Sequence, residues 1–364
     1  MQNRLEFSDV IFDSVVGGVS VLDLARLHLK DLHGAREFIK AYGFDMEKKE
    51  DLESVWDLHK NAVTMLRDRI LEPTEEIPLE LAERNALTDV SKLLLYASSS
   101  EHANSSLQKW SCALLRMMHV LAHLQDGFYN AFSDKIYQAI FDPLQSHLYH
   151  DPEAGLFLGL KEDLEQVPLT RFDMKPSKSL ASSVIKLLTK KDATALSIYD
   201  KVGVRFVTKN IFDSFRVVRY LVDHNLISFP NVVADQSRNT LYPMNLFLEC
   251  MEELTKNTRP LTDEEVDEWL QNKLIESWDR AEYKERNNQF SGANYRSIKF
   301  ITRQIIQVNQ EDRKLKFFYP YEIQIMDNET HLKNISGPEA HEQYKKRQLE
   351  AARQRVLGTL YKSP

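Results

Sequence analysis

The stretch from 321 to 325 carries two polar side chains of different chemistry in an otherwise apolar run, because Glu322 and Gln324 alternate with Tyr321, Ile323 and Ile325. Such alternation predicts a β-strand, and alternate residues of a strand point to the same face of a sheet. An apolar strand seldom carries a carboxylate that has no partner. We therefore expect Glu322 to bind a metal ion or to take the proton of an attacking hydroxyl group.

A second carboxylate, Asp200, comes shortly before an apolar run that holds Val202 and Val204 and continues to Arg205. This run predicts a buried strand with Asp200 at its start. A carboxylate in this place is typical of Mg²⁺ sites, in which the ion takes one or two carboxylates together with phosphate oxygens of a substrate. The alternative is an aspartate that only forms part of a turn at the strand edge.

Basic residues and one hydroxyl follow a regular pattern after Lys175, because Lys178, Ser182 and Lys186 are spaced four residues apart. A helix places residues at this spacing along one face. Two ammonium groups and a hydroxyl in a row suit a polyphosphate, toward which lysine acts as a point charge. A solvated helix end shows the same pattern, so both interpretations stay open.

The segment Tyr295-Arg296-Ser297-Ile298-Lys299 begins a further predicted strand. If this strand is a neighbour of the strand with Glu322, Tyr295 presents a flat ring to a nucleotide base in the same cleft. The alternative for Tyr295 is packing in the core or at an interface.

These residues have to be positioned by a mixture of strands and helices. Residues 1–150 are predicted to be helical, whereas the remainder alternates strands, expected near 202–207, 295–306 and 317–325, with helices, expected near 211–221, 261–286 and 338–356. This alternation indicates a mixed sheet with helices packed on it. The expected fold class is therefore α+β, with a helical accessory or regulatory domain over 1–150 and a mixed-sheet domain over 151–364. The acidic part of 250–290 is expected to be a helical insertion in the second domain.

The composition argues against several classes of protein. Among 364 residues, 47 Lys and Arg stand against 54 Asp and Glu, and the resulting net charge of −7 does not favour DNA binding. Two cysteines, Cys112 and Cys250, are too few for a disulfide scaffold or a four-cysteine zinc site. The first residues lack the features of a signal peptide, and no apolar run reaches the roughly 20 residues that cross a bilayer. We expect a cytoplasmic protein without a membrane segment.

Taken in order, the motifs resemble those of the RelA/SpoT-type alarmone synthetases from Lys175 to the end of the chain. The family's phosphate motif, its Asp-containing strand and its tyrosine motif are matched in turn by Lys178, Ser182 and Lys186, by Asp200 and Arg205, and by 294–299. The family's Glu-x-Gln strand and the spaced polar residues after it are matched by Glu322, Gln324, His331, Gly337, Ala340-His341 and Tyr344-Lys345.

The resemblance implies a nucleotidyltransferase-like domain that transfers pyrophosphate from ATP to the ribose 3′-hydroxyl of GDP or GTP, which forms a (p)ppGpp-like alarmone. It implies Mg²⁺ as cofactor, held by Asp200 and Glu322, with the role of base as the alternative for Glu322. The residues implied for the ATP phosphates are Lys175, Lys178, Ser182, Lys186 and Arg205. The residues implied for the acceptor are Tyr295, Lys299, Gln324, His331 and His341, with Tyr295 stacked on the guanine.

The sequence also departs from the family pattern. Pro176 replaces the usual arginine of the phosphate motif, Asn294 replaces the glycine of the tyrosine motif, and Lys299 replaces its histidine. These changes concern the acceptor more than the transfer itself. An adenine nucleotide or the 3′ end of tRNA is therefore an alternative acceptor, and a nucleotide-binding sensor without turnover is the alternative that is not an enzyme.

The helical half carries one further candidate site. His119 and His123 are spaced four residues apart on the predicted helix near 110–132, a geometry that binds metal ions and that packed core histidines also show. Residues 1–150 contain no His-Asp dipeptide of the kind that longer members of the family use for hydrolysis. We expect this half to regulate the protein through a protein partner or a second copy of the chain.

Overall fold

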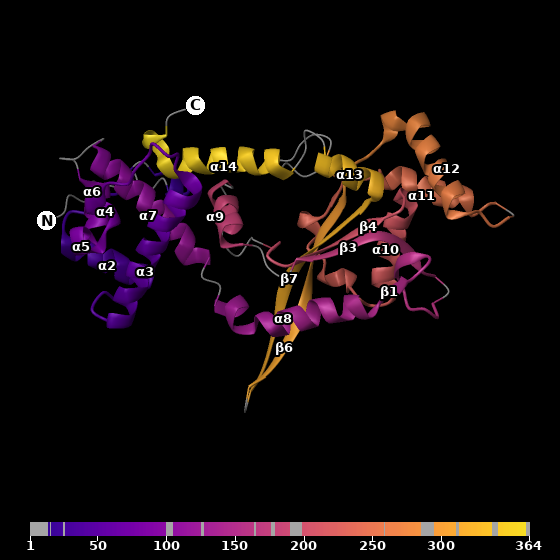
Figure 1. Ribbon diagram of the computed structural model, residues 1–364, viewed down its shortest axis with the longest axis horizontal. Coiled ribbons are helices and arrows are strands. Elements are labelled where there is room, and N and C mark those ends of the chain that lie inside the picture. The colour runs from indigo at the N-terminus through magenta and orange to yellow at the C-terminus, as the bar shows by residue number, and fades with distance from the viewer. Residues whose placement is uncertain are drawn as a thin grey trace. The chain divides into compact units, whose positions relative to one another are not determined.

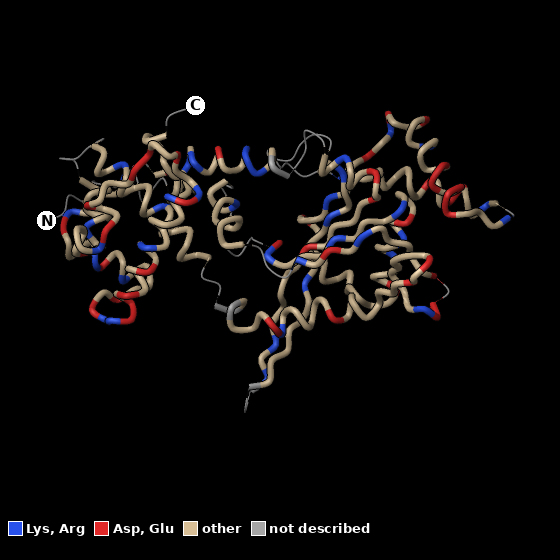
Figure 2. The backbone as a smooth tube through the Cα atoms, viewed as in Figure 1, with Lys and Arg blue, Asp and Glu red and all other residues tan. Residues whose placement is uncertain are grey.

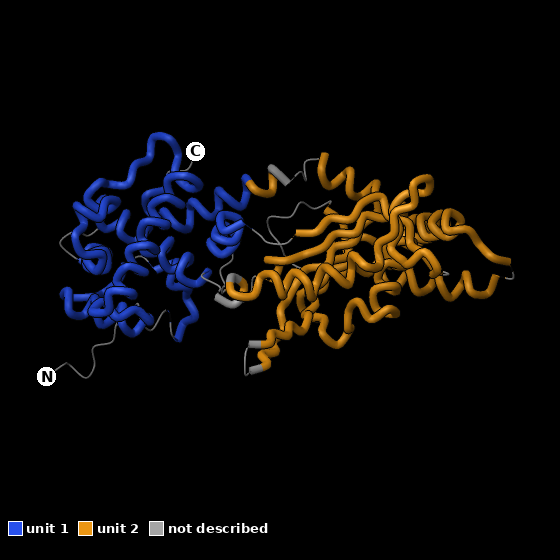
Figure 3. Tube along the Cα trace, turned by 60° about the horizontal axis from the view of Figure 1, so that its bottom comes forward, with its two compact units in different colours: residues 1–126, 179–198, 346–364 blue, residues 127–178, 199–345 orange. Residues whose placement is uncertain are grey.

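The computed structural model describes residues 14, 16–24, 26–99, 105–124, 127–163, 165–175, 179–189, 199–257, 259–284, 295–310, 313–336 and 341–361. The chain divides into two compact units, which Figure 3 shows in different colours. The first unit combines residues 1–126 with the later segments 179–198 and 346–364, and the second combines 127–178 with 199–345. The expected boundary near 150 therefore lies inside the second unit, and two late segments belong with the first.

The first unit consists of helices in the part that the structure describes. They are η1 (Val21–Asp23), α2 (Leu32–Tyr42), α3 (Lys49–Met65), η2 (Leu66–Ile70), α4 (Leu79–Ala82), α5 (Arg84–Leu87), α6 (Lys92–Ser98), α7 (Ser106–Leu124), α9 (Leu180–Thr189), most of α14 (His341–Leu357) and η7 (Gly358–Leu360).

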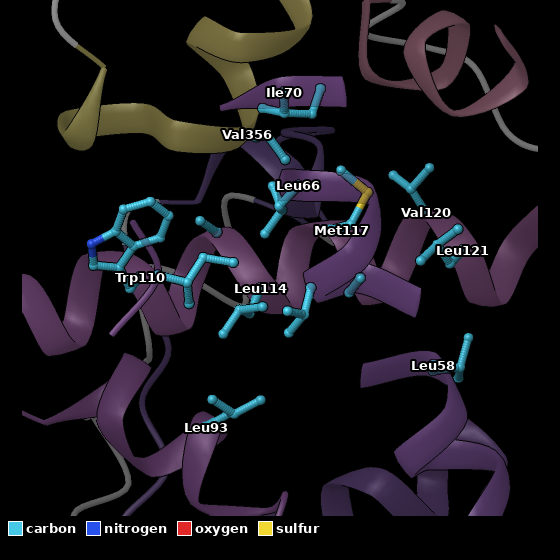
Figure 4. Packing of buried hydrophobic residues seen from close by; sticks show 14 of the residues in the cluster. Leu58, Leu66, Ile70, Leu93, Trp110, Leu114, Met117, Val120, Leu121 and Val356 are labelled. Atoms are coloured by element: carbon cyan, nitrogen blue, oxygen red, sulfur yellow. The ribbon is translucent and has the colours of Figure 1, made fainter. Parts of the chain in front are cut away.

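Helix α7 forms the centre of this unit's core (Figure 4). Its buried residues Trp110, Leu114, Met117, Leu121 and Leu124 recur every three or four positions, which is the spacing of one helix face. Buried residues of the late segments join the same core, namely Val184, Leu187 and Leu188 of α9 and Ala352, Val356 and Leu357 of α14. The apolar face of each late helix is covered only by packing against the early helices, which explains why both belong to the first unit.

The second unit is built on a mixed sheet of seven strands with the order β1-β2-β3-β4-β7-β6-β5 (Figure 1). The strands are β1 (Leu148–Asp151), β2 (Gly155–Leu158), β3 (Val167–Lys175), β4 (Gly203–Thr208), β5 (Arg238–Asn239), β6 (Ile298–Gln310) and β7 (Arg313–Asp327). Strands β4 and β7 are parallel and the other neighbours are antiparallel. The expected α+β class with a mixed sheet is confirmed.

Helices surround this sheet. They are α8 (Gly127–Ser146), α10 (Ile211–Asp223), η4 (Phe229–Asn231), η5 (Ala234–Gln236), α11 (Met244–Leu254), α12 (Asp263–Glu276), η6 (Trp278–Arg280) and α13 (Asn328–Ser336). Helices α11 and α12 form the expected helical part of 250–290, and Tyr242, Leu246, Cys250 and Leu270 give them a small core of their own.

The two faces of the central strands differ in chemistry. Residues such as Val204, Phe206, Ile323, Ile325 and Phe300 are buried in one core with residues of α8 and α10. The residues between them on the same strands point to the other face, because successive side chains of a strand alternate. That second face carries the polar residues described below.

Strands β6 and β7 continue beyond their neighbours as a two-stranded arm (Figure 1). Strand β7 pairs with β4 only from Glu322 onward, whereas it pairs with β6 along its whole length. Residues Tyr129 and Phe132 of α8 pack against Tyr319 and Phe317 on one side of this arm. Within the described part of the chain, no helix has the length and apolar character that a bilayer crossing needs.

Candidate functional site

A polar strip crosses four adjacent strands of the second unit, as the charged residues of Figure 2 indicate. Asp173 and Lys175 of β3 pair with Arg205 and Gly203 of β4, and these pair with Gln324 and Glu322 of β7. On the far side, Lys299 of β6 is opposite Gln324. Directly paired residues lie on the same face of a sheet, so Lys175, Arg205, Glu322, Gln324 and Lys299 share one face.

The ammonium group of Lys299 forms an ion pair with Oε2 of Glu322. Burial alone lowers the pKa of Lys299, but the carboxylates of Glu322 and Asp200 outweigh this effect and raise it. Lys299 is therefore charged at neutral pH, and both predicted catalytic carboxylates act on the same ammonium group. The sequence predicted the two carboxylates together but assigned Lys299 to the acceptor.

A chain of hydrogen bonds runs beside this pair. Nε of Arg205 donates to Oε1 of Gln324 at 2.9 Å, and the amide of Gln324 donates to the hydroxyl of Tyr295. Arg205 also lies 3.9 Å from a carboxylate oxygen of Asp173. Tyr295 and Arg205 are thus both hydrogen-bonded to the side chain of Gln324. These two bonds explain why a polar residue occupies this position of an otherwise apolar strand.

Gly203 is required where β4 and β7 approach each other at the strip. A Cβ atom at this position would lie 3.2 Å from the carbonyl oxygen of Glu322 and 3.4 Å from its Cβ. The first contact is tighter than ordinary packing, and its partner is backbone that cannot turn away. The glycine therefore leaves room for the parallel strand that carries Glu322.

The positive charges of the strip crowd one another. The pKa of Lys175 is lowered, first by desolvation of its ammonium group and then by the charges of Arg205 and Lys299. An anion that approached these three cations would relieve their repulsion. The strip therefore combines an anion-binding character with two carboxylates.

Helix α13 brings His331 to the same region, and this histidine is buried. Its pKa is lowered by desolvation and then by the charges of Arg205 and Arg171, so its ring is neutral at pH 7. Asn334 of α13 donates to the carbonyl of Arg296 at 3.0 Å and thereby holds the segment that carries Tyr295. Thr240 holds the same segment, because its hydroxyl accepts from the backbone N–H of Ser297 at 3.1 Å.

Several predicted site residues are placed elsewhere or are not described. Ser182 and Lys186 lie on α9, in the first unit, so their predicted role at the ATP phosphates stays a prediction. Lys178 lies outside the described residues. His341 begins α14, and its side chain is outside the described part.

Sequence reasoning missed Asp173, whose carboxylate lies 2.7 Å from the guanidinium of Arg171 on β3. Alternation of charged residues with Phe172 and Met174 was the available signal for this strand. Strands β1, β2 and β3 were not expected from the sequence, because the short strands β1 and β2 carry no charged–apolar alternation long enough to recognise.

The carboxylate oxygens of Asp200 and Glu322 are the kind of ligand that Mg²⁺ prefers. Among the described residues, no group of three or more His, Cys, Asp and Glu side chains is arranged to hold a metal. Two carboxylates suffice for Mg²⁺ when waters and substrate phosphates complete its shell. The donor set therefore fits the ion, with Lys299 as a competing cation.

The histidine pair of the first unit has a clear structural partner. Nδ1 of His119 is 2.9 Å from the hydroxyl of Tyr42, and the rings of His119 and His123 are 4.4 Å apart. Desolvation, and then the neighbouring His123, lower the pKa of His119 to about 4. The His-Asp dipeptide at 150–151, just past the helical half, lies in β1, where Asp151 accepts from the backbone N–H groups of Glu153 and Ala154.

No protein-family model matches the sequence, and no curated protein matches it. Solved structures similar to the chain include small alarmone synthetase 1 from Bacillus subtilis, at 12% identity and a TM-score of 0.28, with 63% of this chain and 91% of that chain covered. Small alarmone synthetase 2 from the same organism matches at 19% identity and a TM-score of 0.23, with 51% and 74% covered. A GTP pyrophosphokinase family protein from Streptococcus pneumoniae matches at 14% identity and a TM-score of 0.24, with 66% and 89% covered.

A further structure of the first synthetase contains its product pppGpp. The four structures named are of small alarmone synthetases and of a GTP pyrophosphokinase family protein. Their TM-scores lie below 0.5, so the assignment of a function depends on the side chains and contacts of this chain.

Proposed function

We propose that the chain is a pyrophosphotransferase that moves the pyrophosphate of ATP to the ribose 3′-hydroxyl of a guanine nucleotide, GDP or GTP. The observation that carries this proposal is the polar strip, in which Glu322 lies among Lys175, Arg205 and Lys299 with Asp200 close to the same ammonium group. Crowded cations suit the phosphates of two nucleotides, and the carboxylate supplies a proton acceptor.

In the proposed reaction, the 3′-oxygen of the acceptor attacks the β-phosphorus of ATP. The bond from the β-phosphorus to the oxygen that bridges it to the α-phosphorus breaks, and AMP leaves with that oxygen. Glu322 takes the proton of the 3′-hydroxyl. Lys175 and Arg205 neutralise charge on the phosphates, so that the protein contributes mainly position and electrostatics.

Asp200 and Glu322 are the residues that would hold Mg²⁺. When bound, the ion would neutralise phosphate charge and help to align the two nucleotides. Tyr295, which Gln324 fixes through its hydroxyl, is proposed to stack on the acceptor base. His331 is proposed to support the acceptor side as a neutral ring, and the phosphate roles of Lys178, Ser182 and Lys186 and the acceptor role of His341 remain predictions.

A second candidate acceptor, the 3′ end of tRNA, is favoured by the outer face of the arm. Phe318 and Ile305 pair across β6 and β7 on this face and are 51% and 39% exposed. Arg303 lies over the ring of Phe318 at 5.4 Å, and Lys314 and Lys316 are exposed farther along. In the described part of the arm, residues 302–310 and 313–320, the charged residues are all basic.

Basic side chains with exposed aromatic rings bind single-stranded nucleic acid. By the alternation of the strands, this face is continuous with the face that carries Lys299 and Glu322. A polynucleotide with its 3′ end at Glu322 would thus find complementary charge along the arm.

The test is chromatography of labelled ATP after incubation with the full chain, Mg²⁺ and one acceptor at a time, namely GDP, GTP, ADP, AMP or deacylated tRNA. The proposal expects a more highly phosphorylated guanine nucleotide, equimolar AMP, and loss of both in Glu322→Gln. Product on tRNA alone would shift the assignment to the second candidate. Nucleotide binding without AMP release would overturn the transferase and leave a nucleotide sensor.

A further inference from the structure

The ion pair between Lys299 and Glu322 lies where the proposed function needs a metal ion. The two side chains are 34% and 16% exposed, so this pair is partly shielded from water. Lys299 sits two residue pairs along the sheet from Glu322, since Glu322 is opposite Ile301 and Lys299 is opposite Gln324. Its side chain therefore turns along the strip toward the carboxylate.

An ammonium group and a divalent cation compete for the same carboxylate. The ion pair uses Oε2 of Glu322, and a metal ion that binds this oxygen has to displace the ammonium group first. The positive charge also repels a second cation, and partial burial weakens the screening of that repulsion by water and salt. Asp200 is under the influence of the same ammonium group.

We infer that Lys299 is a built-in counter-ion of Asp200 and Glu322, which keeps divalent metal ions out of this site until phosphates of a nucleotide arrive. The inference rests on the proposed function, because it takes Asp200 and Glu322 as the metal ligands. It goes beyond that function in assigning Lys299 control over when the metal binds.

The negative charge of phosphate groups changes the outcome of the competition between Lys299 and a metal ion for the carboxylate of Glu322. The strip already carries Lys175 and Arg205 beside Lys299, and these cations repel one another. Bound phosphates offer new oxygens to the ammonium group of Lys299 and add negative charge that favours the metal. Metal and nucleotide then bind together, whereas each binds weakly alone.

The experiment is a titration of the full chain with Mn²⁺, without nucleotide, in which electron paramagnetic resonance measures free Mn²⁺. The variants are Lys299→Met, Lys299→Arg, Glu322→Gln and the matched control Lys256→Met, which removes a lysine from the exposed pair with Glu252. Lys299→Met is expected to bind Mn²⁺ about tenfold or more tighter than the native chain, because one nearby positive charge is gone. Lys299→Arg and Lys256→Met are expected to match the native chain.

Thermal unfolding shows whether Lys299→Met is folded and binds Mn²⁺ in the folded state. Removal of the lysine leaves Glu322 without its partner, and Mn²⁺ should therefore raise the unfolding temperature of this variant more than that of the native chain. Equal or weaker Mn²⁺ affinity in Lys299→Met, or no Mn²⁺ binding in any variant, overturns the role of Lys299.

The experiment distinguishes a wrong role for Lys299 from a wrong assignment of the metal ligands. If Glu322→Gln loses the Mn²⁺ site but Lys299→Met does not strengthen it, the role of Lys299 is wrong while the metal assignment stands. If Lys299→Met binds Mn²⁺ more tightly and the double variant Lys299→Met/Glu322→Gln binds it just as tightly, the metal assignment within the proposed function is wrong.

Discussion

The two units arrange their charged side chains in opposite ways. In the first unit, Arg353 is nearly buried and donates to the carbonyl of Ile70 and to both carboxylate oxygens of Glu75, at 3.1 and 3.2 Å. Arg355 likewise pairs with both carboxylate oxygens of Asp23, at 2.7 and 2.9 Å. These arginines come from α14 and tie it to the early part of the chain.

In the second unit, the strip gathers like charges. Desolvation, and then the charges of Arg205 and Lys299, lower the pKa of Lys175, and two carboxylates act on the ammonium group of Lys299. Such crowding costs energy in the free protein, whereas a paired arginine that joins two segments stabilises the fold. Arginines that join two segments of one unit are typical of a structural role, whereas repulsion between neighbouring cations is typical of a site for an anionic ligand.

The largest effect should come from Glu322→Gln. Loss of the carboxylate removes the proposed proton acceptor, and we expect pyrophosphate transfer to fall by about a thousandfold or more. Rates of AMP release give the measurement, with circular dichroism to show that the fold is retained. Glu329→Gln, in an exposed pair with Lys333, is the control. Full activity in Glu322→Gln would contradict the assignment of the strip.

Arg353→Met tests the structural role of a paired arginine in the first unit. It leaves Glu75 partly buried without its partner, so the free energy of unfolding should drop by about 3–5 kcal/mol. Denaturant unfolding measures this change. Arg67→Met, which removes an exposed pair with Glu83 at 3.9 Å, should cost less than about 1 kcal/mol. Equal losses in both variants would contradict the structural role of Arg353.

Lys175→Met should separate binding from stability. It removes one of the crowded cations, so KM for ATP should rise by about tenfold while the free energy of unfolding stays equal or increases. Steady-state kinetics and denaturant unfolding of the same preparation check both expectations. A loss of stability without any change in KM would place Lys175 with the structural charges of the first unit.

The smallest effect concerns the pH dependence of the free energy of unfolding, to which His119 of the first unit contributes. Because the pKa of His119 is lowered to about 4 in the folded chain, the unfolded chain binds more protons between pH 4 and its ordinary pKa near 6.5. Stability should therefore rise with pH across this window and level off above it. His119→Gln should flatten the rise, as denaturant unfolding at several pH values will show. An unchanged slope in this variant would assign the effect to other groups.

The local pattern of apolar and polar residues was sufficient to predict many of the strands and helices. Alternation located strands β4, β6 and β7 to within a few residues, except that the arm extends β6 and β7 toward each other. The helices expected near 211–221 and 338–356 correspond to α10 and α14, whereas the helix expected near 261–286 ends early, because α12 stops at Glu276. A capping box of Thr262 with Glu265 begins α12. These signals depend on neighbours within one or two turns, so a single sequence displays them.

The sequence by itself determined which residues are candidates for the chemistry, namely the carboxylates, the basic residues and the tyrosine of the strip. Only the tertiary structure decided that β4 lies parallel to β7, that Lys299 pairs with Glu322, and that α9 and most of α14 pack with the first unit. The pairing of β4 with β7 joins residues more than a hundred positions apart, and Lys299 reaches Glu322 only because β6 and β7 pair in this register. Such contacts depend on which apolar faces cover one another across the whole chain, and no local spacing encodes that choice.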